Sequence, residues 1–161
     1  MPFGDGNGTA VKGDQKIQNA AAGNLIMTRH EERELALCLL FEWNSDRERS
    51  LTEIYDTAKE VRDVEESAYV REILAGIEAH VAELDALIDE HAKGWKRNRI
   101  SRISLSTIYI AAYEMLYCDK IPTRVSLNEA IELTKAYDDE KAYAFVNGVL
   151  HALGSKAPQK D

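Results

Sequence analysis

Helix breakers and long apolar runs are both scarce in this 161-residue chain. It has three prolines, and five of its nine glycines lie within the first 23 residues. Because proline and glycine interrupt helices most often, the rest of the chain favours an all-α fold. No apolar run reaches the ~18 residues of a membrane-spanning helix, and no secretory signal pattern opens the chain. We therefore expect a cytoplasmic protein that does not enter a membrane.

Residues that catalysis and metal binding require are also few. The two cysteines, Cys38 and Cys118, lie among apolar residues at helical spacing, which predicts reduced core thiols rather than a disulfide. The four histidines fall in separate places, and even His80 and His91 on one predicted helix are about 16 Å apart. Glycine-rich phosphate-binding motifs and the G-x-S-x-G motif are absent from the sequence. We expect no catalytic residue, no metal and no cofactor.

The net charge of −8 is unevenly distributed along the chain. Residues 46–93 carry fourteen acidic and six basic side chains, whereas WKRNRISR (95–102) carries four basic and no acidic ones. Two interpretations of this basic segment remain open. Its cations contact phosphate, or those nearest the preceding helix complement the dipole at its C-terminus. The four cations are Lys96, Arg97, Arg99 and Arg102.

Apolar side chains recur at helical spacing in six segments, which predicts six or seven helices. Thr28 with Glu31, and Ser50 with Glu53, are typical of capping boxes at helix starts. The short connections make consecutive helices antiparallel neighbours, so we expect a compact helical bundle. The predicted helices cover residues 28–43, 50–61, 65–93, 105–116, 125–137 and 138–153.

The first 27 residues show no apolar periodicity and predict a flexible leader, with Met27 as an alternative natural start. Residues 28–153 form the predicted helical domain, and 154–161 form a flexible tail. Within the last two helices, Asn128 and Asn147 are predicted to be buried amides. Gly148 lies in the middle of a helix, which predicts a close approach of another helix.

The segment IPTRVSLNEAIELTKAYDDEKAYAFVNGVL (121–150) resembles the C-terminal signature of the NusB family of bacterial transcription antitermination factors. The likeness continues through AAYEM (111–115), ILAGI (73–77) and RELALCLLFEW (33–43), and it covers roughly residues 28–153. It implies an all-α domain of two helical subdomains without catalysis or cofactor. It also implies a heterodimer with the ribosomal protein NusE, although free members of the family can form homodimers. Such a pair binds boxA-type single-stranded RNA within the RNA polymerase antitermination complex and suppresses premature termination in ribosomal RNA operons.

The resemblance also suggests which residues contact RNA and partner. In TRHEER (28–33), Arg29 and Arg33 match the family's arginine-rich helix start and lie one turn apart, with His30 beside them. We expect RNA contacts from these three residues and from the four cations of segment 95–102. Phe41 and Phe145 match aromatic positions associated with the NusE interface, although a plain core role is an open alternative. The expected partner contacts are Phe41, Tyr113, Tyr137 and Phe145.

Several positions depart from the family pattern. Glu31 and Glu32 stand where basic or small residues are common, Tyr109 replaces a frequent arginine, and Ser104-Leu105 replaces a charged pair. Two hypotheses therefore remain. The protein binds RNA weakly alone and more tightly with its partner, or it is an interaction scaffold with little RNA binding of its own.

Overall fold

The computed structural model describes residues 26–92 and 94–160, and within these ranges it contains helices and no strand. The all-α prediction is therefore confirmed. The chain divides into two compact units, Met1–Glu78 and Ala79–Asp161. The elements, in order, are α2 (Arg29–Ser45), α3 (Leu51–Arg62), α4 (Ala68–Ala79), α5 (Val81–His91), the 3-10 turn η1 (Arg97–Arg99), α6 (Arg102–Tyr117), α7 (Thr123–Tyr137) and α8 (Glu140–Lys156).

Helix α2 forms the centre of the first unit. It begins with the predicted capping box, in which Thr28 Oγ1 accepts the N–H of Glu31 at 3.1 Å. Glu31 Oε1 accepts the N–H of Thr28 at 2.9 Å. Residues 33–40 are all buried, so every side of the helix is covered over this stretch. The core around it includes Leu35, Leu39, Trp43, Ile54, Tyr55, Val70, Ile73, Leu74 and Ile77.

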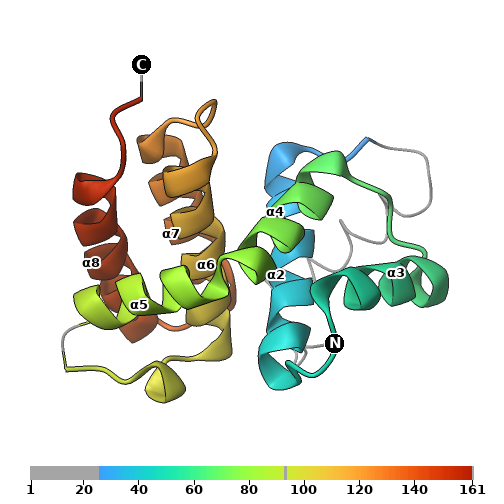
Figure 1. The fold of residues 1–161 in the computed structure, drawn as a ribbon, viewed down its shortest axis with the longest axis horizontal. Helices are drawn as coiled ribbons and strands as arrows, with labels where there is room; N and C mark the ends of the chain where they lie inside the picture. The colour runs from blue at the N-terminus through green and yellow to red at the C-terminus, as the bar shows by residue number, and fades with distance from the viewer. Residues whose placement is uncertain (1–25, 93, 161) are drawn as a thin grey trace. The chain divides into compact units, whose positions relative to one another are not determined.

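Helix α6 has the same central place in the second unit, where residues 104–115 are all buried. Helices α7 and α8 pack against α6 and against each other, and α5 contacts α6 and α8. Figure 1 shows α7 and α8 side by side, with α5 running across their direction. Asp139 is the N-cap of α8, near the predicted helix start at residue 138, and its Oδ1 accepts the N–H of Ala142 at 2.8 Å.

The single long helix predicted over residues 65–93 is wrong. The structure has two helices there, α4 and α5, separated by His80 with φ −111° and ψ 15°. The His80 ring stacks on Tyr117 with centroids 4.2 Å apart. The apolar spacing from Ile77 to Leu84 stays helical across the break, so this contact with α6 overrides a local pattern that favours one helix.

Several predicted local environments also differ from the structure. Asn128 is exposed and Asn147 is half-buried, so neither is a fully buried amide. Gly148 is exposed, and a Cβ atom there would meet nothing within 4 Å, which excludes the predicted close approach at that point. Cys38 is buried as predicted, but Cys118 is half-buried at the C-cap of α6. Most of the predicted leader, residues 1–25, lies outside the described residues.

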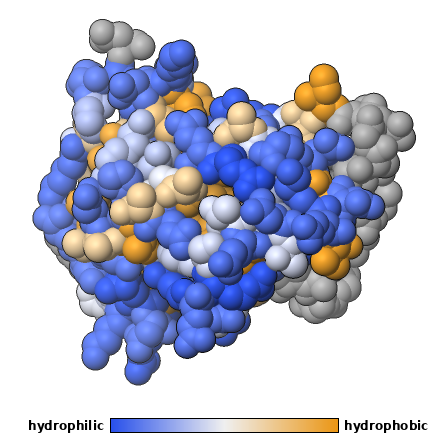
Figure 2. All heavy atoms as spheres, turned by 45° about the vertical axis from the view of Figure 1, so that its right-hand side comes forward, coloured by the Kyte–Doolittle hydropathy of each residue, from blue (hydrophilic) through white to orange (hydrophobic). Residues whose placement is uncertain are grey.

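Hydrophilic side chains dominate the face of the molecule drawn in Figure 2, and the hydrophobic residues on it form small separate groups. Within the described residues, no helix combines the length and hydropathy needed to cross a membrane.

The C-terminal segment is tied to the second unit through Lys160. Helix α8 continues to Lys156, so the predicted tail begins three residues later than expected. Beyond it, Lys160 Nζ donates to the carbonyl oxygens of Glu114, Cys118 and Ile121 at 2.8, 2.8 and 2.7 Å. These carbonyls lie at the C-terminal end of α6 and in the turn that follows, where the negative end of the helix dipole favours a cation.

We expect Lys160→Ala to lower the free energy of unfolding by about 1–2 kcal/mol, because three charge-assisted hydrogen bonds are lost while the tail gains freedom. Thermal unfolding followed by circular dichroism measures the effect. Lys156→Ala is the matched control, since Lys156 makes an exposed ion pair with Glu90 at 3.2 Å and solvent screens it. Equal shifts for the two variants would contradict the anchoring role of Lys160.

Candidate nucleic-acid interface

The first cationic site lies at the start of α2. Arg29 has a side chain that is 52% exposed, and its Nε donates to Glu32 Oε1 at 3.1 Å. Its guanidinium carbon also lies 4.3 Å from the centre of the Tyr69 ring. This cation–π contact and the ion pair hold Arg29 at the surface without burying it. Arg29 is therefore oriented and available to a phosphate.

The two glutamates of TRHEER have separate structural roles. Glu31 completes the capping box described above. The Glu32 carboxylate pairs with Arg29 and also accepts the Ser67 hydroxyl, which ties α2 to the residue preceding α4. Glu32 thus orients Arg29 but also offsets its charge, so the positive potential at this helix start is weaker than the sequence alone suggests.

The remaining residues of this first site agree only partly with the prediction. Arg33 is 3% exposed, with its guanidinium carbon 5.7 Å from the centre of the Tyr69 ring. Its burial is at odds with the predicted direct RNA contact, because Tyr69 from α4 lies against it. The His30 side chain is 36% exposed, and its Nε2 lies 3.9 Å from Glu34 Oε2. Tyr69 itself was not predicted, since nothing in its local sequence links it to Arg29 and Arg33, which precede it by 40 and 36 positions.

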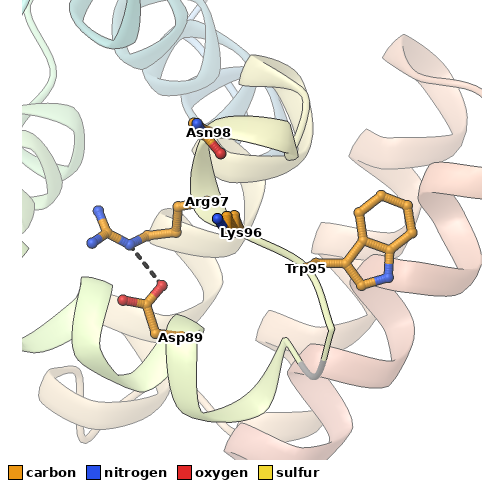
Figure 3. Close-up of a pocket in the computed structure, with 5 residues that line it drawn as sticks. All are labelled: Asp89, Trp95, Lys96, Arg97 and Asn98. Carbon is orange, nitrogen blue, oxygen red and sulfur yellow. Dashed lines mark hydrogen bonds and ion pairs between the residues drawn. The ribbon is translucent and has the colours of Figure 1, made fainter.

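The second cationic site is the loop between α5 and α6, in the other unit. Arg97 Nε donates to Asp89 at 2.8 Å, and its Nη1 lies 3.0 Å from Asp85. Figure 3 shows Arg97 pointing toward Asp89, with Trp95 directed to the opposite side of the loop. The Asp89 hydrogen bond, with the nearby Asp85 charge, raises the pKa of the Arg97 guanidinium, which stays charged. Arg97 is thus a loop anchor, and its charge is largely offset.

The other cations of this loop face solvent. Lys96, Arg99 and Arg102 are exposed. Among the residues that the structure describes, no carboxylate forms an ion pair with Lys96 or Arg99. An open pocket of about 460 Å³ at this loop is lined by Asp89, Trp95, Lys96, Arg97 and Asn98. The loop therefore combines Lys96 and Arg99, two exposed cations without a carboxylate partner among the described residues, with the exposed ring of Trp95, which is typical of single-strand binding surfaces.

The departures from the family pattern have local partners in this chain. Tyr109 is fully buried, and its hydroxyl donates to Asp85 at 2.5 Å, next to the Arg97 ion pair. Ser104 and Ser101 both donate to Asp138 Oδ2, at 2.8 and 2.6 Å, which joins the start of α6 to the end of α7. Neutral hydroxyls thus satisfy carboxylates at positions where the family often has charged residues.

The predicted partner residues lie in both units. Phe41 is half-buried on α2 in the first unit. In the second, Phe145 is half-buried with its ring 5.4 Å from that of Trp95, and Tyr137 is half-buried at the end of α7. Tyr113 is 8% exposed, and its ring lies 5.1 Å from that of Tyr117. Phe145 and Trp95 therefore form a surface aromatic pair, whereas Tyr113 belongs mainly to the core.

Comparisons with known proteins place the chain in a family. The NusB family model matches residues 30–154. The transcription antitermination protein NusB of Clostridium acetobutylicum is 38% identical over 136 residues, which covers 83% of this chain and 100% of that protein.

Solved structures agree with this match. NusB of T. maritima superposes with a TM-score of 0.74 at 27% identity, covering 83% of this chain and 96% of that one. A structure of the antitermination factors NusB and NusE in complex with dsRNA gives a TM-score of 0.69 at 23% identity, covering 81% of this chain and 99% of the other. The second likeness shows the shared fold. Together with the sequence matches, these results establish that the chain belongs to the NusB family.

Proposed function

We propose that this protein is a transcription antitermination factor that acts in the cytoplasm, binds boxA-type single-stranded RNA together with NusE, and suppresses premature termination in ribosomal RNA operons. The observation that carries the proposal is its match, over most of the chain, to relatives named transcription antitermination protein NusB. The role is regulatory, without catalysis, metal or cofactor.

The proposed RNA contacts are two separate cationic sites. Arg29, with His30 beside it, supplies the first, and the loop residues Lys96, Arg97, Arg99 and Arg102 supply the second. Four cations are exposed on these sites, so at ~0.7 per phosphate the log–log salt slope for single strands reaches about −3. A slope of this size with a net charge of −8 supports weak binding by the protein alone.

The partner in this proposal is NusE, within the RNA polymerase antitermination complex. The half-buried aromatic rings Phe41, Tyr137 and Phe145 supply apolar contact area, since each is partly open to solvent. Tyr113 contributes from beneath the surface. The complex supplies the phosphate contacts that this acidic chain lacks. We also propose that the chain forms a homodimer when NusE is absent.

A second candidate is an interaction scaffold of the same fold with little RNA binding. The observation in its favour is that Arg29 and Arg97 are paired with carboxylates while Arg33 is buried. The scaffold would bind NusE with unchanged RNA affinity in the resulting complex.

Terminator read-through in a transcription assay tests the proposal. The template carries boxA upstream of a terminator, and reactions contain polymerase and NusE with and without this protein. We expect more full-length transcript when the protein is added, and only on the boxA template. Equal read-through with and without boxA would contradict an RNA-dependent role.

A further inference from the structure

We infer that the pocket beside Trp95 holds one unstacked nucleotide of single-stranded RNA, with the base against the indole and the phosphate at Lys96. This inference rests on the proposed RNA-binding function and adds to it a site for a base, where the cations alone supply only contacts to the backbone. Trp95 and Asn98 then contribute to RNA recognition by stacking and hydrogen bonding, in addition to the charge contacts of segment 95–102.

Trp95 is unusually exposed for its size. It is 55% exposed, whereas Trp43, the other tryptophan, is 3% exposed in the core of the first unit. The Phe145 ring supports it at a centroid distance of 5.4 Å and an interplanar angle of 52°. One side of the indole is therefore held in place while more than half of its surface remains open. An exposed aromatic ring held in this way is a stacking platform for any base.

The backbone around the pocket is fixed at several points. Trp95 N–H donates to the Ala92 carbonyl at 2.8 Å, and Gly94 in this turn has φ +81°, a conformation that side-chain-bearing residues rarely adopt. Arg99 N–H donates to the Lys96 carbonyl at 2.9 Å, and Arg97 is held by its two aspartates. A loop ordered before binding loses less conformational entropy when a ligand enters.

The groups lining the pocket match the parts of a nucleotide. Its volume of about 460 Å³ lies in the range of small-ligand sites, roughly 300–1,000 Å³. Figure 3 shows Trp95 on one side of the loop and the Arg97–Asp89 pair on the other, with Lys96 between them. The indole offers stacking, the Lys96 ammonium offers a phosphate contact, and the Asn98 amide offers a donor and an acceptor for a base edge.

Charge favours a nucleic acid over a protein at this site. The loop carries four cations, and the one carboxylate that lines the pocket, Asp89, already accepts a hydrogen bond from Arg97. Lys96 and Arg99, on either side of Asn98, are exposed and lack a carboxylate partner among the described residues. A negatively charged strand with unstacked bases uses both the cations and the ring, which explains why they lie together.

Two readings on one titration test the inference. A fluorescein-labelled boxA-type RNA is added to the protein in complex with NusE, and anisotropy reports binding. The titration is repeated with unlabelled RNA and a tryptophan-free NusE variant. Tryptophan emission then reports binding at the pocket, because Trp95 is the exposed tryptophan of this chain. We expect emission to fall as RNA binds. Trp95→Ala should weaken RNA binding about five- to fiftyfold, and Trp95→Phe less than threefold.

Val61→Ala is the matched control, since Val61 is 75% exposed and lies in the other unit on α3. It should leave RNA affinity unchanged, and circular dichroism verifies that each variant is folded. RNA binding with unchanged emission and full affinity of Trp95→Ala would overturn the pocket and leave the proposed function standing. A loss of NusE affinity in Trp95→Ala with unchanged RNA affinity would make Trp95 a protein contact. RNA binding by neither the protein nor its complex would overturn both.

Discussion

Replacing Tyr55 with phenylalanine is expected to lower the free energy of unfolding by about 2–4 kcal/mol. The Tyr55 hydroxyl accepts the N–H of Ser67 and donates to the carbonyl of Glu65, both at 2.8 Å. Tyr55 is fully buried, and Ser67 is 5% exposed. Phenylalanine fills the same volume but leaves the buried N–H and the carbonyl without their partner.

The Tyr55 hydroxyl is also connected to the first cationic site through Ser67 and Glu32. Ser67 Oγ donates to Glu32 and accepts the N–H of Val70 at 3.1 Å, and Glu32 in turn orients Arg29. Urea unfolding followed by tryptophan emission measures the stability loss, because Trp43 reports the first unit. Tyr143→Phe is the control, since Tyr143 is half-buried on α8 and its removed hydroxyl should cost less than ~0.5 kcal/mol. Similar losses for both variants would contradict the account.

Burial raises the pKa of the Tyr55 hydroxyl to about 12. The folded state therefore favours the neutral phenol, so the associated stability is fully present below pH 10, the ordinary value, and is lost as the pH rises toward 12. Tyr117 contributes in the same range, because its hydrogen bond to Glu83 raises its pKa to about 12. The Tyr55→Phe variant should accordingly lose less stability between pH 10 and 12 than the unmodified protein.

The second large effect is expected for Arg97→Ala, which should weaken RNA binding by the NusE complex about tenfold or more, equal to ~1.4 kcal/mol or more. The variant loses one cation and also exposes the charges of Asp85 and Asp89, which Arg97 otherwise offsets. It also removes the ion pairs that hold η1 against α5. Lys96→Ala removes one cation without exposing a carboxylate, so we expect only a two- to threefold loss, roughly one phosphate contact.

A rescue variant separates the two causes. Adding Asp89→Asn to Arg97→Ala removes one of the exposed negative charges, and it should recover at least threefold of the lost RNA affinity. Fluorescence anisotropy at fixed salt compares the four proteins. If Arg97→Ala and Lys96→Ala weaken RNA binding equally, and adding Asp89→Asn recovers no RNA affinity, then the aspartates do not oppose RNA binding at this loop.

The starts of α2, α3 and α8 could be predicted because their signals are local, whereas α6 begins at Arg102, three residues before the predicted start. Thr28, Ser50 and Asp139 each accept a backbone N–H three residues later, and each begins a helix in the structure. The break at His80 could not be predicted in this way, because it depends on the stacking of the His80 ring against Tyr117, 37 positions away. Apolar spacing continues through the break, so periodicity alone favours one helix.

The charged residues of the candidate site could be predicted from the sequence, but the environments of their side chains could not. The cations of segment 95–102 are evident from the sequence, and three of them are exposed. The burial of Arg33 depends on Tyr69, and the offset of Arg97 depends on aspartates from α5. Neither pairing has a sequence signal of its own, because helical packing brings those residues together. The exposure of Trp95 likewise follows from the turn at Gly94 and from the distant Phe145.

The central claim is that this chain binds single-stranded RNA jointly with NusE. The most direct measurement is titration of labelled boxA-type RNA with the protein alone and with NusE, at two salt concentrations. We predict weak binding alone, at least tenfold tighter binding with NusE, and a log–log salt slope for the protein alone no steeper than about −3. Formation of the NusE complex without any gain in RNA affinity over NusE alone would contradict the account and favour the scaffold.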